Sequence, residues 1–161
     1  MSKDLKVLEK LELIIPGFKG YKQKELIRED DRLIRNYLFS KIKDAEETIR
    51  SYLAASLDGK IPISASELNV VAKDLNSLGI KIRVSPTGYS GYFDRIKVTE
   101  ENLEQLKKLD TTLVTNCEEI ASLAKKVREN TSLLVELKEK IRALNNAIDE
   151  RNLVLNSLKG D

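Results

Sequence analysis

The chain has 161 residues, of which 41% are hydrophobic and 34% are charged, and its formal net charge is only +2. It contains a single Cys, Cys117, and no His, which excludes a Ser-His-Asp or Cys-His catalytic unit, a thiolate metal cluster and an intrachain disulfide. No segment reaches the ~18 consecutive apolar residues that suggest a membrane span, and none resembles a signal peptide. We therefore expect a cytoplasmic protein, and abundant Lys, Glu and Ile with little Cys or Met is typical of a thermophile.

The first two elements are expected to be a short helix over residues 3–14 and a connector over residues 15–21. Pro16 biases the residue before it away from helical geometry, and the two glycines of the connector permit positive φ. Residues 22–57 then contain no Pro and no Gly, and their apolar residues recur at steps of three, four and seven. This spacing predicts a long amphipathic helix that ends before Gly59.

A third helix is expected over residues 64–78. Ser64 can cap its first turn, and Glu67, three residues later, completes a capping box. Gly79 is suited to the left-handed position that often ends a helix.

A small β-hairpin is expected after this helix, with strands at about 80–84 and 92–98. Apolar and basic side chains alternate in residues 80–84, and residues 92–98 alternate similarly between two faces. A segment that contains Pro and Gly separates the two. Such a pattern is typical of two strands joined by a loop. A lone hairpin is marginal in water, so we expect it to lie against a helix.

The last element is expected to be one long helix over residues 100–158, which Thr99 caps. No Pro or Gly interrupts it, and its apolar stripe repeats at alternating steps of four and three, the spacing of a coiled coil. Unbroken, such a helix spans about 87 Å at roughly 1.5 Å per residue. The alternative is a bend near Asn130, because Asn, Thr and Ser compete for backbone hydrogen bonds in that segment.

The helix over 22–57 is long enough to cover only the first half of this last helix. The apolar stripe of the distal part, residues 137–158, would then face water at a cost of roughly 25 cal/mol per Å². The stripe must then be covered by the N-terminal helix, by a second copy of the chain or by another protein. We expect a dimer, or docking of another protein, through Leu137, Ile141, Leu144, Ile148 and Leu155. Together the elements predict a single domain, 1–161, of the mainly α class: an antiparallel, coiled-coil-like bundle of long helices with one small β-hairpin.

Two segments combine aromatic, glycine and basic residues, and each has two interpretations. In the connector, lysines beside a helix N-terminus could hold phosphate, or the aromatic residues could pin the connector to the core. In the predicted hairpin, aromatic rings beside arginines could stack on bases or on a protein partner, or they could pack the hairpin against a helix. The candidate surface for a protein or nucleic-acid partner comprises Lys19, Tyr21, Lys22, Lys24, Arg28, Lys81, Arg83, Tyr89, Tyr92 and Arg95.

The same two segments carry a resemblance. Residues 16–25 read PGFKGYKQKE and residues 88–94 read GYSGYFD. They resemble an uncharacterised family of helical proteins in bacteria and archaea, with a Pro-Gly-aromatic-Arg/Lys-Gly-Tyr-Lys opening and a Gly-Tyr-Ala/Ser-Gly-aromatic-Phe-Asp hairpin. The resemblance covers about 17 residues and implies no activity or catalytic residue, but it implies that both segments belong to one recurring design.

The other candidates for chemistry have a structural interpretation that we favour. Cys117 lies on the apolar stripe of the last helix, which indicates a small buried hydrophobic residue rather than a redox thiol. The acidic runs 29–31 and 118–119 could bind a divalent cation. Consecutive helical residues point in different directions, however, so we expect a solvated face with i,i+4 ion pairs. No phosphate-binding glycine motif is present, and we expect no cofactor and no metal.

These observations favour a non-enzymatic structural or interaction protein, a helical scaffold or adaptor that associates with itself or with a partner through its C-terminal helix. The alternative is a nucleic-acid or ribosome-associated binding module that uses the basic connector and hairpin. Phosphate contacts of such a module would make its affinity fall steeply with salt.

Overall fold

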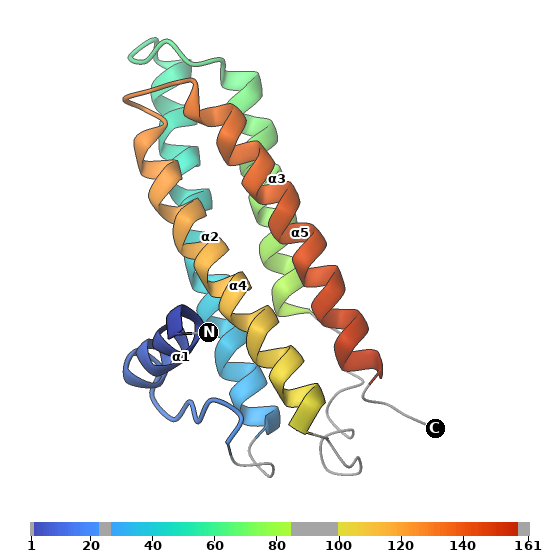
Figure 1. The fold of residues 1–161 in the computed structure, drawn as a ribbon. Coiled ribbons are helices and arrows are strands. Elements are labelled where there is room, and N and C mark those ends of the chain that lie inside the picture. Colours follow the sequence, from blue (N-terminus) through green and yellow to red (C-terminus); the bar gives the residue numbers. More distant parts are fainter. Residues whose placement is uncertain (1, 23–26, 85–99, 158–161) are drawn as a thin grey trace.

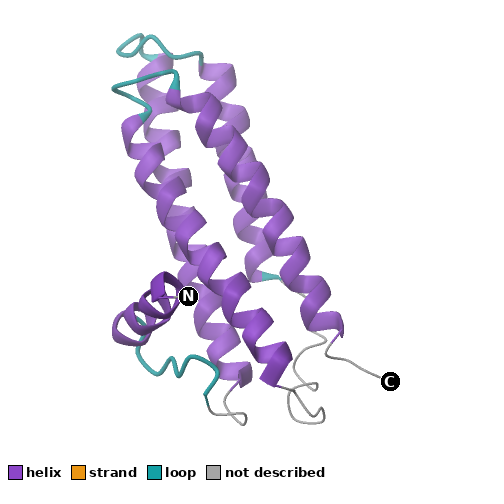
Figure 2. Cartoon of the chain, in the orientation of Figure 1, coloured by secondary structure: helices purple, strands orange, loops and turns teal. Residues whose placement is uncertain are grey.

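The computed structural model describes residues 2–22, 27–84 and 100–157. This part of the chain is mainly α, as predicted, and contains no strand (Figure 2). Its five helices are α1 (Ser2–Ile14), α2 (Ile27–Leu57), α3 (Ala65–Arg83), α4 (Glu100–Lys126) and α5 (Leu133–Ser157). None of these helices is long and apolar enough to cross a membrane.

The four long helices form a bundle of two antiparallel hairpins, one made by α2 and α3 and the other by α4 and α5 (Figure 1). The hairpins pack side by side, so that α2 lies beside α4 and α3 lies beside α5. Within each of these neighbouring pairs the two helices run in the same direction. The short helix α1 lies outside the bundle, against α4.

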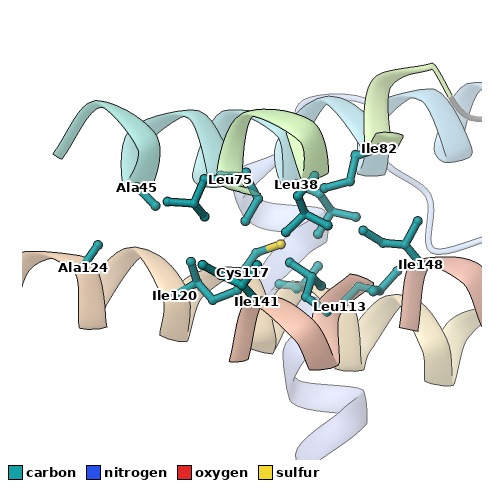
Figure 3. Packing of buried hydrophobic residues seen from close by; sticks show 14 of the residues in the cluster. Leu38, Ala45, Leu75, Ile82, Leu113, Cys117, Ile120, Ala124, Ile141 and Ile148 are labelled. Atoms are coloured by element: carbon teal, nitrogen blue, oxygen red, sulfur yellow. The ribbon is translucent and has the colours of Figure 1, made fainter. Parts of the chain in front are cut away.

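The core is formed by the apolar stripes of all four long helices. Side chains from α2 and α3, such as Leu38 and Leu75, face those of α4 and α5 across a common interior (Figure 3). Cys117 lies in the middle of this interior, fully buried, and burial raises the pKa of its thiol. Its interpretation as a small buried hydrophobic residue is therefore confirmed.

The prediction of one continuous helix over residues 100–158 is wrong. α4 ends at Lys126, the chain reverses, and α5 begins at Leu133. In the turn, the side-chain oxygen of Asn130 accepts hydrogen bonds from the backbone N–H of Ser132 (3.2 Å) and from its hydroxyl (2.6 Å). The interruption thus falls where a bend was considered, and competition of a side chain with helical hydrogen bonding accounts for it.

Because the chain reverses, the apolar stripe of α5 returns to the core of its own molecule. The five side chains predicted to mediate self-association are all buried inside the bundle: Leu137, Ile141, Leu144, Ile148 and Leu155. The expectation that residues 137–158 face water is therefore wrong. These side chains are not available as the predicted self-association surface.

The prediction of a first hairpin strand at about 80–84 is also wrong. Ser64 caps α3 as expected, with its hydroxyl accepting from the N–H of Glu67 at 3.4 Å, but α3 continues through Gly79 to Arg83. Alternation over only five residues fits both a strand and a helix: Ile82 faces the core, while Ile80 is exposed. The predicted second strand, 92–98, lies outside the described residues.

Gly79 does not end α3 but lies buried in its interior. A Cβ atom at this position would come within 3.5 Å of the Phe39 ring of α2. This distance is an ordinary van der Waals contact, so the helix packing does not require glycine at position 79, and the predicted role as a helix cap is wrong.

Candidate functional site: a buried charged cluster and an open helical face

A buried cluster of charged groups joins α2, α4 and α5 at one end of the bundle. At its centre is Arg151 of α5, whose Nε donates to Asp110 Oδ1 of α4 and whose Nη2 donates to Asp31 Oδ1 of α2, each at 2.6 Å. Arg151 is only 3% exposed, and both aspartates are fully buried. One guanidinium thus pairs with two carboxylates that water does not reach.

Tyr21 brings the connector into the same cluster. Its hydroxyl donates to Asp110 Oδ2, and Arg151 Nη2 lies 3.5 Å from the hydroxyl oxygen. Its ring is fully buried and meets the ring of Phe18 edge to face, with centroids 5.8 Å apart. The connector is therefore fixed to the core by its aromatic residues, the second of the two interpretations considered for it.

The position of Tyr21 is set by Asp30, the neighbour of Asp31 on α2. The two carboxylate oxygens of Asp30 accept hydrogen bonds from the backbone N–H groups of Lys19 (2.7 Å) and Tyr21 (2.8 Å). This clamp holds Tyr21 at φ 62°, in the left-handed region that non-glycine residues rarely adopt. Because a carboxylate occupies these amides, they are not available to bind phosphate.

The cluster extends to α3 through Arg35. Arg35 Nε donates to Asp31 Oδ2 at 3.0 Å, and its Nη1 donates to the carbonyl of Arg83 at 3.4 Å. Asp31 therefore has a second cationic partner, whereas Asp110 depends on Arg151 and the Tyr21 hydroxyl.

Burial dominates the electrostatics of the cluster. It raises the pKa of Tyr21 well above its ordinary value, and the charge on Asp110 acts in the same direction. Burial also raises the pKa of Asp110, while Arg151 opposes that rise. Burial disfavours the charge on Arg151, but Asp110 and Asp31 outweigh this effect and raise the pKa of the guanidinium. Tyr21 thus stays a hydrogen-bond donor and Arg151 stays a cation.

This cluster is suited to holding the chain together rather than to chemistry. Its carboxylates accept from Arg151 of α5, from Tyr21 of the connector and from Arg35 of α2, and they have no exposed surface for a substrate. No group of three or more metal-ligating side chains occurs among the described residues. A general acid or base needs hydrogen-bond access to the substrate proton, which this arrangement does not offer.

The candidate surface derived from the sequence is only partly brought together. Tyr21 is buried, so its assignment to a partner surface is wrong. Lys22 pairs with Glu12 at 2.9 Å and Lys81 pairs with Asp149, while Arg83 lies over the Phe39 ring at 5.0 Å. The rest of this surface is divided: Lys19 and Arg28 are exposed, and the side chains of Lys24, Tyr89, Tyr92 and Arg95 lie outside the described residues.

The cluster was not predicted from the sequence. The acidic run 29–31 was expected on a solvated face, which is wrong for Asp30 and Asp31, both fully buried. The apolar spacing nevertheless indicated two buried charges. On α2 the apolar stripe is interrupted between Ile27 and Ile34, where Asp31 lies, and on α5 between Ile148 and Leu155, where Arg151 lies. A charged residue in such a gap occupies a core position of the helix.

The second feature is an open face between the parallel neighbours α3 and α5. A hollow of about 480 Å³ lies between them, with Leu78 and Ile141 among its lining residues together with Asp74, Lys138 and Arg142. Exposed apolar side chains accompany it: Val70 on α3, and Val135 and Leu153 on α5. We call this surface the α3–α5 face; it comprises Val70, Asp74, Ser77, Val135, Lys138, Arg142, Asn145 and Leu153, and the buried Leu78 and Ile141 also line its hollow.

The spacing along each helix places these residues on one surface. Val70 and Ser77 are seven residues apart on α3, and both line the hollow. On α5, Val135, Arg142 and Leu153 are separated by seven and eleven residues, so they share one edge. Val70, Val135 and Leu153 are 52%, 61% and 68% exposed. Such spacing is typical of a seam that receives other helices.

Comparison of the chain with protein-family models, with curated proteins and with solved structures gave no match. The protein is thus a four-helix bundle with an external N-terminal helix, a buried charged cluster and an open α3–α5 face. The resemblance in the connector and residues 88–94 stays a resemblance of two short segments.

Proposed function

We propose that this protein is a non-enzymatic helical scaffold or adaptor that docks a polypeptide on its α3–α5 face. The observation that carries the proposal is the coincidence of a hollow, exposed apolar side chains at helical spacing, and charged groups at the rim. Grooves between helices with apolar anchors and polar rims are a common way of binding amphipathic helices.

The buried cluster supports a scaffold rather than an enzyme. This cluster of ionisable groups is closed to solvent and joins four segments, the connector, α2, α4 and α5. Its contribution is to fix the connector and to hold α2, α4 and α5 in register. A rigid bundle presents a docking face in one geometry, which lowers the entropic cost of binding.

The alternative, a nucleic-acid binding module, has less support. Lys22 and Lys81 are paired with carboxylates, so binding phosphate through them first requires breaking these ion pairs. The backbone amides of Lys19 and Tyr21 are taken by Asp30. Nucleic-acid binding would need a basic surface that its own acidic groups do not neutralise.

A photo-crosslinking amino acid at Ser77 tests the proposal, because Ser77 is exposed and lines the hollow. The control is the same substitution at Glu47, which is exposed on α2. After irradiation of cells that express each chain, we expect a discrete protein adduct from position 77, identified by mass spectrometry, and none from position 47. The adduct should disappear when Val70→Asp is added. Equal labelling at both positions, or no adduct at position 77, contradicts the proposal.

A further inference from the structure

We infer that the polypeptide docked on the α3–α5 face is a second copy of this chain, related to the first by a twofold axis parallel to the helices. The inference rests on the proposed function and adds the identity of the partner. It is carried by the distribution of charge across the face and by the parallel course of its two helices.

Charges on α3 and α5 have opposite signs at each level of the face. Near the start of the two helices, Glu67 of α3 pairs with Lys138 of α5 at 4.0 Å. Near their ends, the signs are reversed, and Lys81 of α3 pairs with Asp149 of α5. Between these levels, Asp74 and Arg142 line the same hollow from opposite sides.

Asp74 and Arg142 carry opposite charges that no ion pair among the described residues explains. Within the described part of the chain, neither makes a salt bridge or a side-chain hydrogen bond. Both are exposed at the rim. Internal ion pairing therefore explains the opposite signs at the two outer levels but not at the middle one.

A twofold axis that runs along the groove, parallel to the helices, brings the opposite charges of two copies together. Rotation by 180° about such an axis exchanges the sides of the groove without changing helix direction, so each α3 lies over the partner's α5. Asp74 then faces the partner's Arg142, and the same contact occurs a second time by symmetry. An axis perpendicular to the helices and lying in the face would instead place α3 antiparallel on the partner's α3. The outer charges would still meet opposite signs, but Asp74 would face Asp74 and Arg142 would face Arg142.

The exposed apolar residues fit the same arrangement. Val70 lies on the α3 side of the groove, and Val135 and Leu153 lie on the α5 side, at different levels along the helices. The rotation keeps each residue at its own level, so these side chains add apolar area at the contact without facing one another. The resulting contact joins four helices along a seam whose residues recur at about seven. Its small apolar area predicts a reversible dimer whose population depends on concentration.

The test is sedimentation equilibrium of the full chain and of charge variants. We expect the wild type to associate from 18.2 kDa toward twice that mass as its concentration rises. Asp74→Arg places Arg against the partner's Arg142, and Arg142→Asp places Asp against the partner's Asp74. Each reversal creates two like-charge contacts per dimer, so each should weaken the dimer by about tenfold or more.

Mixing the two variants gives the decisive measurement. In a dimer of one Asp74→Arg chain and one Arg142→Asp chain, both contacts again join opposite charges. We therefore expect the mixture to form heterodimers at concentrations where each variant alone is monomeric, and the double variant D74R/R142D to associate like the wild type. Far-ultraviolet circular dichroism of each variant serves as the folding control.

A wild type that stays monomeric to several hundred micromolar overturns the inference, as does a dimer that neither single reversal weakens. These failures are distinct from failure of the proposed function. If position 77 crosslinks to a different protein while the chain alone is monomeric, the α3–α5 face is a docking surface and only the identity of the partner is wrong.

Discussion

Arg151→Met is a direct test of the buried charged cluster. Methionine retains an unbranched apolar side chain of similar length but removes the charge and the N–H donors that serve Asp110 and Asp31. Asp31 keeps Arg35 as a partner at 3.0 Å. Asp110 keeps only the Tyr21 hydroxyl, so the substitution leaves one buried carboxylate without a counter-charge.

The expected cost is large for a single substitution. Breaking a buried ion pair by removing one partner typically lowers the free energy of unfolding by about 3–5 kcal/mol. A domain of this size has about 5–15 kcal/mol in total, so about a fifth or more of its stability would be lost. The corresponding fall in Tm is about 2–4 °C for each kcal/mol, or roughly 10 °C.

The measurement is urea denaturation followed by circular dichroism, with Arg142→Met as the matched control. Arg142 lies on the same helix but is exposed, and its substitution should change the free energy of unfolding by less than about 0.5 kcal/mol. The double variant R151M/D110N removes the stranded charge while leaving an acceptor for the Tyr21 hydroxyl. It should recover at least half of the loss.

A loss below about 1 kcal/mol for Arg151→Met would refute the reasoning, because a buried carboxylate cannot lose its counter-charge at so small a cost. Failure of Asp110→Asn to recover any stability would contradict the assignment of the penalty to the Asp110 charge.

Three further predictions concern single positions. Tyr21→Phe should lower the free energy of unfolding by about 1–3 kcal/mol at pH 8, because Asp110 loses a donor. Since the folded-state pKa of Tyr21 lies well above its ordinary 10.0, the unfolded chain ionises first, and the difference from wild type should shrink in urea titrations at pH 10.5. Gly79→Ala should raise the stability by about 0.5–1 kcal/mol in the same assay, since its Cβ would make ordinary contact with Phe39; a loss would mean that the helices cannot accept it. Asn130→Ala should lower the Tm by about 2–4 °C through loss of the turn hydrogen bonds, and an unchanged Tm would show that they are dispensable.

The mainly α fold could be predicted because apolar spacing is a property of each helix by itself. The path of the chain between helices could not. At Asn130 the sequence allowed either a bent rod or a reversal, and only the packing of α5 on α3 and α4 decides between them. At residues 80–84, five residues were too few to separate a period of two from one of 3.6, and burial of Ile82 against the bundle decided for helix.

The buried cluster was harder to predict, because each of its charges depends on a partner far away in the sequence. In the last helix, a spacing of three and four selects the apolar residues Leu106, Leu109 and Leu113, whereas Asp110 is the residue between Leu106 and Leu113 that faces the core. For a helix taken by itself, Leu109 is the expected core residue rather than Asp110, since burying an unpaired charge is very costly. Only the position of Arg151, which is brought there by the reversal at Asn130, makes Asp110 acceptable in the interior.

The separation of the cluster partners along the chain also bears on how the protein folds during synthesis. Asp31 and Arg151 are 120 residues apart, so α2 leaves the ribosome long before Arg151 exists, and until then Asp31 has only Arg35 of its own helix as a cationic partner. The α2–α3 hairpin can form early, but burying its charged end is unfavourable until α5 arrives. The buried charged cluster can therefore be completed only late in synthesis, when α5 packs on the α2–α3 hairpin.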